Sequence, residues 1–148
     1  MSQQTEPDPI DPASGEPDKA SAAGTVVLGI PADRDQVTLV RSVAGHIGAR
    51  LGLSVAQLTD LRLAVDEACG LFLLAPGFPK ADALLECRFE QQPQALRITV
   101  SALVPDGLAP DLDDIGWIML DALVDELTWE SADGVATVSL LTRLGRRA

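Results

Sequence analysis

The chain has 148 residues, which is enough for one domain with a sizeable hydrophobic core and a tail. Its formal net charge of −11 argues against direct binding to nucleic acid and to anionic membranes, and it favours a basic protein partner. Hydrophobic residues make up 47% of the chain and aromatic residues only 3%, so we expect a core of Leu, Val, Ala and Ile.

The first 24 residues differ in composition from the rest. They hold four prolines and five acidic residues, with Ile10 as the one branched aliphatic residue. We therefore expect a disordered acidic leader at 1–24 and a single folded domain at 25–148. The longest apolar run, Leu71 to Pro76, is far too short to span a membrane, and the polar start is unlike a secretory signal. These features predict a cytoplasmic protein.

A strand and a helix are predicted at the start of the domain. Thr25 to Ile30 is rich in β-branched residues and ends at Pro31, which is typical of an edge strand. Asp33 should cap a helix that Gly52 ends. The polar face of this helix is either a solvated face or a docking surface, and it carries Arg34, Arg41, His46 and Arg50. Arg34 and Arg41 are our candidate partner-binding residues.

The most regular stretch is predicted to form a central helix, capped by Ser54 or Thr59 and ended by the segment from Pro76 to Pro79. Its apolar residues recur at steps of three and four, as expected of one buried stripe: Leu58, Leu61, Val65, Ala68, Phe72 and Ala75. A second stripe places the carboxylate of Glu67 in the middle of an otherwise apolar helix, and Asp66 lies beside it.

Two alternating segments, Ala83 to Glu90 and Ala95 to Leu103, predict strands joined in an antiparallel hairpin. Their polar residues fall on one face, so we expect one face of the sheet to be wet and the other to pack under helices. Cys69 and Cys87 lack the spacing of a metal site, and we expect two buried thiols in preference to a disulfide.

A loop at 104–115 precedes a third helix, predicted from Gly116 to Leu127, and a closing hairpin around Asp133 and Gly134. The loop and this helix form a negative patch, which contains Asp106, Asp111, Asp113, Asp114, Asp121, Asp125 and Glu126. The order of elements predicts an α+β fold. We expect a two-layer sandwich in which three helices pack on one face of a mixed, mostly antiparallel sheet.

The phrase L-R-L-A-V-D-E-A-C, at Leu61 to Cys69, resembles the N-box helix of the histidine-kinase-like ATPase superfamily, the Bergerat fold. Within that superfamily it is most similar to the anti-sigma-factor serine kinases, bacterial switch proteins that hold sigma factors. The stretch from Gly116 to Leu127 resembles the third helix of this family, and Gly134 to Leu141 resembles its last strand. The similarity covers roughly 25–144 in element order.

The resemblance implies a nucleotide pocket between the helices and the sheet. In active members, a Glu on the N-box helix is the general base, and an Asn four residues later binds magnesium. Glu67 matches that Glu, but Leu71 occupies the Asn position and offers no lone pair. Ala102 occupies the position of the Asp that reads adenine, and Gly116 is the one remaining glycine of the phosphate lid.

We therefore expect neither a bound cofactor nor a metal ion. Leu71, Phe72 and Trp117 could fill the space that adenine would take. The alternative cofactor is ATP with magnesium. In that case the resemblance assigns nucleotide binding to Glu67, Asp66, Asp106, Gly107 and Gly116, with Asp106 and Gly107 as an out-of-register substitute for the adenine-reading motif.

The leading functional hypothesis is an anti-sigma factor-like regulator without catalysis. It would bind a sigma factor and be countered by an anti-anti-sigma protein, and its acidic patch would complement a basic DNA-binding sigma domain. The alternative is an ATP-dependent serine kinase that phosphorylates the antagonist, with Glu67 as catalytic base. A third hypothesis is a nucleotide binder whose ligand tunes protein affinity without chemistry. The resemblance also implies homodimers.

Overall fold

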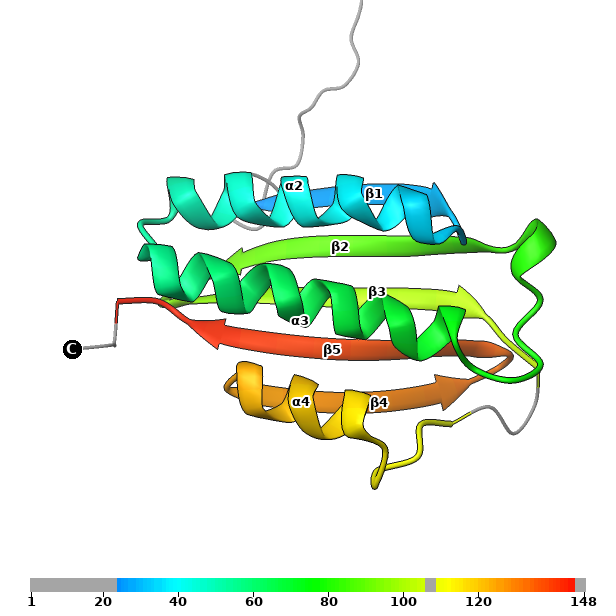
Figure 1. The fold of residues 1–148 in the computed structure, drawn as a ribbon. Helices are drawn as coiled ribbons and strands as arrows, with labels where there is room; N and C mark the ends of the chain where they lie inside the picture. Colours follow the sequence, from blue (N-terminus) through cyan, green and yellow to red (C-terminus); the bar gives the residue numbers. More distant parts are fainter. Residues whose placement is uncertain (1–23, 106–108, 146–148) are drawn as a thin grey trace, which may run out of the picture.

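The computed structural model describes residues 24–105 and 109–145. Its elements follow the predicted order and form two layers (Figure 1). They are β1 (Thr25–Pro31), α2 (Arg34–Arg50), α3 (Val55–Leu73), a 3-10 turn η1 (Lys80–Asp82), β2 (Leu84–Gln92), β3 (Ala95–Leu103), α4 (Ile115–Leu123), β4 (Glu126–Ala132) and β5 (Val135–Arg143). The predicted leader and the candidates Asp106 and Gly107 lie outside the described residues.

The five strands form one sheet in the order β1-β2-β3-β5-β4. Every pairing in the described sheet is antiparallel, whereas we expected a mixed, mostly antiparallel sheet. The reason is that α2 and α3 run out and back between β1 and β2, so β2 starts beside the end of β1 and returns along it. The pair α4 and β4 does the same between β3 and β5. β1 lies at an edge of the sheet, as predicted.

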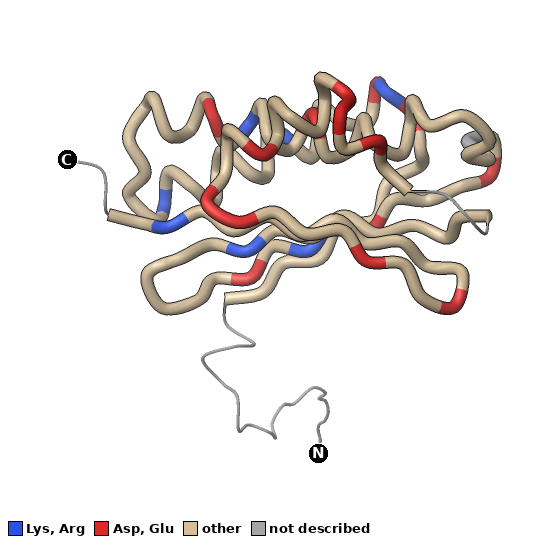
Figure 2. The backbone as a smooth tube through the Cα atoms, turned by 90° about the horizontal axis from the view of Figure 1, so that it is seen from below, with Lys and Arg blue, Asp and Glu red and all other residues tan. Residues whose placement is uncertain are grey.

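The three helices cover one face of the sheet, and the other face is open (Figure 2). Inward side chains of the central strands are fully buried, among them Phe89, Ile98 and Val138. The open face carries the polar side chains that the alternation predicted. There the Arg97 guanidinium donates to Ser139 at 2.7 Å, and the hydroxyls of Ser101 and Thr137 are 3.1 Å apart.

Local signals account for the ends of α2 and α3. Asp33 caps α2 by accepting from the backbone N–H of Asp35, and Gly52 follows this helix with a φ of +88°. Ser54 caps α3 in a reciprocal pair with Gln57. Thr59, our other candidate cap, lies inside α3, where its hydroxyl donates to the Val55 carbonyl.

Two glycines of α2 allow a close approach to α3. A Cβ on Gly48 would lie 2.8 Å from Leu58 Cδ2 and 3.1 Å from Leu61 Cδ2. A Cβ on Gly45 would lie 2.6 Å from Arg62 Nη2, so the Arg62 guanidinium packs directly on the α2 backbone. The helix layer is therefore tight along this seam.

The third helix is shorter than predicted. α4 ends at Leu123, and Leu127, where we expected the helix to end, belongs to β4. The backbone N–H of Asp125 donates to the Leu141 carbonyl, and pairing with β5 then continues from Glu126. Leu127 and Trp129 still point inward, because strand alternation brings them to the core, and the Trp129 ring lies 5.4 Å from Phe72.

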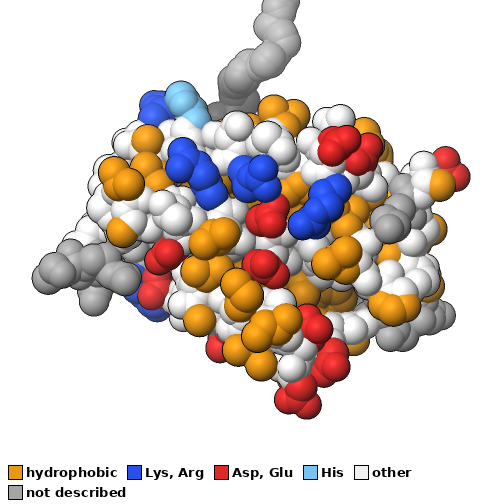
Figure 3. Space-filling model, viewed as in Figure 1, with side chains coloured by type: hydrophobic (Ala, Val, Ile, Leu, Met, Phe, Trp, Pro, Cys, Tyr) orange, Lys and Arg blue, Asp and Glu red, His pale blue; other side chains and the backbone are white. Residues whose placement is uncertain are grey.

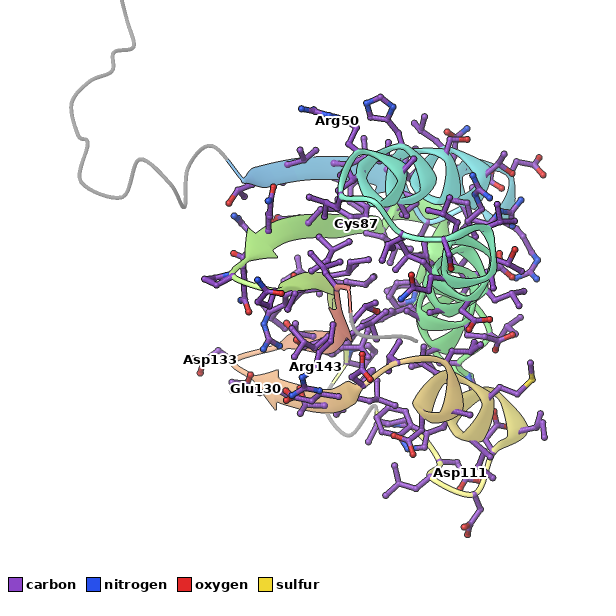
Figure 4. The ribbon with its side chains drawn as sticks, turned by 90° about the vertical axis from the view of Figure 1, so that its left-hand side faces the viewer. Arg50, Cys87, Asp111, Glu130, Asp133 and Arg143 are labelled. Atoms are coloured by element: carbon purple, nitrogen blue, oxygen red, sulfur yellow. The ribbon has the colours of Figure 1, made fainter. Side chains whose placement is uncertain are left out.

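Cys69 and Cys87 are free and fully buried, as predicted, Cys69 on α3 and Cys87 on β2. Figure 4 shows Cys87 on its strand beneath the helix layer. The hydrogen bond that the Cys69 thiol donates to the Cys87 side chain raises the pKa of Cys69, and burial raises it further. No helix of the described residues is long and apolar enough to cross a membrane.

Candidate functional site

A cavity of about 260 Å³ lies between the second half of α3 and the segment that leads into α4. Most of its lining residues are apolar, and the carboxylates of Asp111 and Asp114 lie on its α4 side. The described lining consists of Glu67, Gly70, Leu71, Leu74, Ala75, Pro76, Ala109, Pro110, Asp111, Asp114 and Gly116. The resemblance implies a nucleotide pocket between the helices and the sheet, whereas the described lining of this cavity contains no strand residue.

Glu67 and Gly116 are 49 positions apart in the chain, and the fold brings them together. Glu67 Oε1 is 3.2 Å from the position that a Cβ on Gly116 would take, so the carboxylate lies over the first turn of α4. The pKa of Glu67 is raised by burial and by repulsion from Asp66 and Asp114, while Arg34 opposes this shift. Glu67 is thus a carboxylate in an unfavourable environment for its charge.

Asp66 turns away from the pocket toward α2. It accepts a hydrogen bond from the Arg41 guanidinium at 2.6 Å, and Arg41 also donates to the Thr38 hydroxyl at 3.2 Å. The structure thus separates two candidates that are adjacent in sequence. Glu67 lines the cavity, and Asp66 links α3 to α2.

The N-terminus of α4 is capped by the protein itself. Asp114 accepts from the backbone N–H of Gly116 at 2.9 Å, and Asp111 accepts from that of Asp113 at 2.9 Å. The sequence pattern had indicated Asp111 and Asp114 only as members of the general acidic patch. The signal that could have found them is the run of aspartates directly before an apolar helix, which is a capping pattern.

The described lining does not fit a magnesium nucleoside triphosphate. Leu71 faces the cavity where a metal ligand would be needed, and the cavity is smaller than the about 300–1,000 Å³ typical of small-molecule sites. The charged lining side chains of the described residues are all acidic, and they would repel phosphates. Ala102 is buried on β3 and has no polar group for adenine.

Of the three side chains that we expected to fill an adenine space, Leu71 alone lines the cavity. Phe72 is fully buried in the core, with its ring 5.9 Å from that of Phe78. Trp117 is half-buried and packs on the core from α4. The expectation that no nucleotide binds stays a prediction, because Asp106 and Gly107 are outside the described residues.

Charges divide the helix surface into bands. Figure 3 shows basic side chains in a row over α2 and α3, hydrophobic side chains over α3 and α4, and acidic side chains below them. Arg34 and Arg41 lie on α2, and Arg50, at the C-terminal end of this helix, points into solvent (Figure 4). Asp111 lies in the loop before α4, at the opposite edge of the helix layer (Figure 4).

No family model matches the chain. It is 28% identical over 127 residues to an anti-sigma-F factor RsbW from Mycobacterium tuberculosis strain CDC 1551, a match that covers 83% of this chain and 74% of the relative. A protein of the same description from strain H37Rv gives the same figures.

A solved structure has the same fold. The crystal structure of the RsbU and RsbW domains of a Mycobacterium tuberculosis protein superposes with a TM-score of 0.60 and 20% identity, over 83% of this chain. The chain spans about a third of that solved chain, 34% of its length. The predicted α+β sandwich and the resemblance to anti-sigma regulatory factors are both confirmed.

Proposed function

We infer that this chain, an RsbW-like domain with the histidine-kinase-like ATPase fold, is a transcriptional regulator that binds a sigma factor. The observation that carries this inference is the similarity to anti-sigma factors over 83% of the chain. The charges of the surface support it: Asp111, Asp113, Asp114 and Asp121 form an exposed acidic band that suits a basic DNA-binding partner.

We further propose that an anti-anti-sigma protein releases the sigma factor, as the resemblance implies. Arg34 and Arg41 are the proposed contact residues on α2. Arg34 is exposed, and Arg41 is half-buried by its pairing with Asp66. The folded domain would be 25–148 with an acidic leader before it, the protein would act in the cytoplasm, and two copies could associate as a homodimer.

One observation favours the second candidate, an ATP-dependent serine kinase. Glu67 lies at the pocket, and its pKa is raised, as suits a general base. Two observations argue against a kinase: Leu71 offers no metal ligand, and the acidic lining of the cavity would repel phosphates. Transfer of phosphate from ATP to a purified antagonist, lost in Glu67→Ala, would establish the kinase.

The direct test of the main proposal uses purified sigma factors encoded in the same genome as this chain. Each is titrated with the full chain by calorimetry, without nucleotide. We expect one or a few to bind, and to be released by the cognate antagonist. Failure of every sigma factor to bind, with the chain shown to be folded by circular dichroism, would refute the proposal.

A further inference from the structure

α4 is apolar on the side that it shows to solvent. Seven of its nine residues, I-G-W-I-M-L-D-A-L, are apolar, and Leu120 is the one that is fully buried. The side chains of Ile115, Ile118 and Met119 are 70%, 50% and 41% exposed. A helix that is hydrophobic on all sides normally has protein around it, so this face of α4 lacks a cover.

The apolar surface continues onto α3. Leu63 on α3 is 44% exposed, and Leu74, the C-cap of α3, is 73% exposed and also lines the cavity described above. Figure 3 shows the hydrophobic side chains gathered over these two helices. We call the set Leu63, Leu74, Ile115, Ile118 and Met119 the α4 surface. Contiguous exposed apolar side chains of this kind mark interaction sites.

Charged side chains border the α4 surface unevenly. Asp113 and Asp114 precede α4, and Asp121 lies within it, all three exposed. On the opposite side, the Arg41 guanidinium is engaged by Asp66, and the Arg62 guanidinium packs on the α2 backbone. Arg34 on α2 is exposed as well, so the border is negative beside α4 and keeps a basic side chain on the α2 side.

We propose that the α4 surface is the docking site for a basic amphipathic helix of the partner protein. The apolar stripe of that helix lies against Ile118, Met119 and Leu63, and its Lys or Arg residues face Asp113 and Asp121. This is recognition of a helix by an apolar surface with a charged rim. The inference rests on the proposed function, because it names the surface by which that partner is held.

A second copy of the chain is the less favourable occupant. Each copy carries a net charge of −11, so a homodimer is better formed through a surface that keeps the acidic side chains of the two copies apart. Association through the α4 surface would bring the acidic border of each copy close to that of the other. A basic helix avoids this charge repulsion, because its Lys or Arg residues neutralise the aspartates that border the α4 surface.

The test uses a fluorescein-labelled synthetic helix with a Leu stripe and Lys flanks, and the same peptide with Glu in place of Lys. Fluorescence anisotropy with the full chain should show binding of the Leu/Lys peptide alone. The double variant Ile118→Asn, Met119→Gln should bind the Leu/Lys peptide at least tenfold more weakly than the wild type. Val55→Asn, at an 81%-exposed position at the start of α3, is the matched control and should leave binding unchanged.

A second double variant, Asp113→Asn, Asp121→Asn, tests the role of charge. It should bind the Leu/Lys peptide several-fold more weakly than the wild type and with a smaller salt dependence. Asp133→Asn, at the tip of the β4–β5 hairpin, is the control. Amide shifts of the wild-type chain provide a readout without substitution. On addition of the Leu/Lys peptide, the amide chemical shifts of residues in α4 should change and those of residues in β1 should not.

Three results would overturn the proposal. They are equal binding of the Leu/Glu peptide, unchanged affinity of the Ile118→Asn, Met119→Gln variant, and a wild-type dimer in sedimentation that this variant dissociates. The sigma-factor titration separates the two inferences. If a sigma factor binds this variant as tightly as wild type, the docking surface is wrong and the anti-sigma function stands. If no sigma factor binds but the peptide does, the docking surface stands and the anti-sigma function is wrong.

Discussion

Arg41 on α2 and Asp66 on α3 form an ion pair of 2.6 Å that joins the two helices. Asp66 directly precedes Glu67, the carboxylate that lines the cavity. Both side chains of the ion pair are partly shielded, so we expect a coupling of about 0.5–1 kcal/mol, at the upper end for such pairs. A double-mutant cycle of Arg41→Ala and Asp66→Ala, followed by urea unfolding, measures it. The control pair, Arg88 and Glu86 at 3.4 Å on the open sheet face, should couple near zero. Equal coupling in the two pairs would contradict this expectation.

Glu67→Gln should stabilise the protein at neutral pH. Because the folded-state pKa of Glu67 is raised above its ordinary 4.5, the folded chain binds this proton more tightly than the unfolded chain does. The stabilising contribution is therefore complete below pH 4.5 and is lost as the pH rises through the folded-state pKa. Urea unfolding from about pH 4 to 8 should show wild type and variant equal at low pH and the variant more stable at about pH 7.

Glu130→Gln on β4 is the control for that experiment and should not gain stability over this range. The Arg34 charge lowers the pKa of Glu67, so Arg34→Gln should raise it further in a carbonyl-detected NMR titration. A Glu67 carboxyl that titrates below 4.5 in the wild type would contradict the environment described for it.

Gly48→Ala and Gly70→Ala should change stability in opposite directions. In a helix, alanine gains about 1 kcal/mol over glycine. At Gly70 the nearest atom to an added Cβ is Leu74 Cδ1 at 3.9 Å, so the gain should be realised. At Gly48 the Cβ would meet Leu58 Cδ2 at 2.8 Å and Leu53 Cδ1 at 3.0 Å, and overpacking should cost about 1–3 kcal/mol. Unfolding free energies of the two variants test this, and stabilisation by Gly48→Ala would refute the tight α2–α3 seam.

Leu71→Asn should not create a nucleotide site. The substitution supplies an amide oxygen four residues after Glu67, but Asp111 and Asp114 still repel phosphates, and Ala102 still offers nothing to adenine. Calorimetry with ATP should show no magnesium-dependent binding at millimolar nucleotide in either wild type or variant. Micromolar binding by the wild type would contradict this expectation and favour the kinase.

Short-range chemistry made much of the fold predictable. The caps Asp33 and Ser54, the glycine after α2 and the bounds of β3 all follow from residues within one helical turn or one strand. The boundary between α4 and β4 does not. Leu120, Leu123 and Leu127 fit a helical period, and Leu127 and Trp129 fit a strand, so pairing with β5 decides between them.

The sequence singled out some of the residues that line the cavity, but not their arrangement. The N-box phrase identified Glu67, and the start of the third helix identified Gly116. Their proximity depends on how α3 and α4 pack, which no local pattern encodes. The same packing sends Asp66 to Arg41 and leaves the apolar outer side of α4 exposed to solvent.

The position of β5 between β3 and β4 also sets the order in which the molecule can be built during translation. When β3 has left the ribosome, its outer edge has no partner, and β4 lacks β5, the strand that joins it to the sheet. Only after residues 135–143 emerge can β5 pair with both β3 and β4. At about 5–20 residues per second this delay lasts a few seconds. The sheet of a nascent chain would therefore lack its last two strands until synthesis had passed β5.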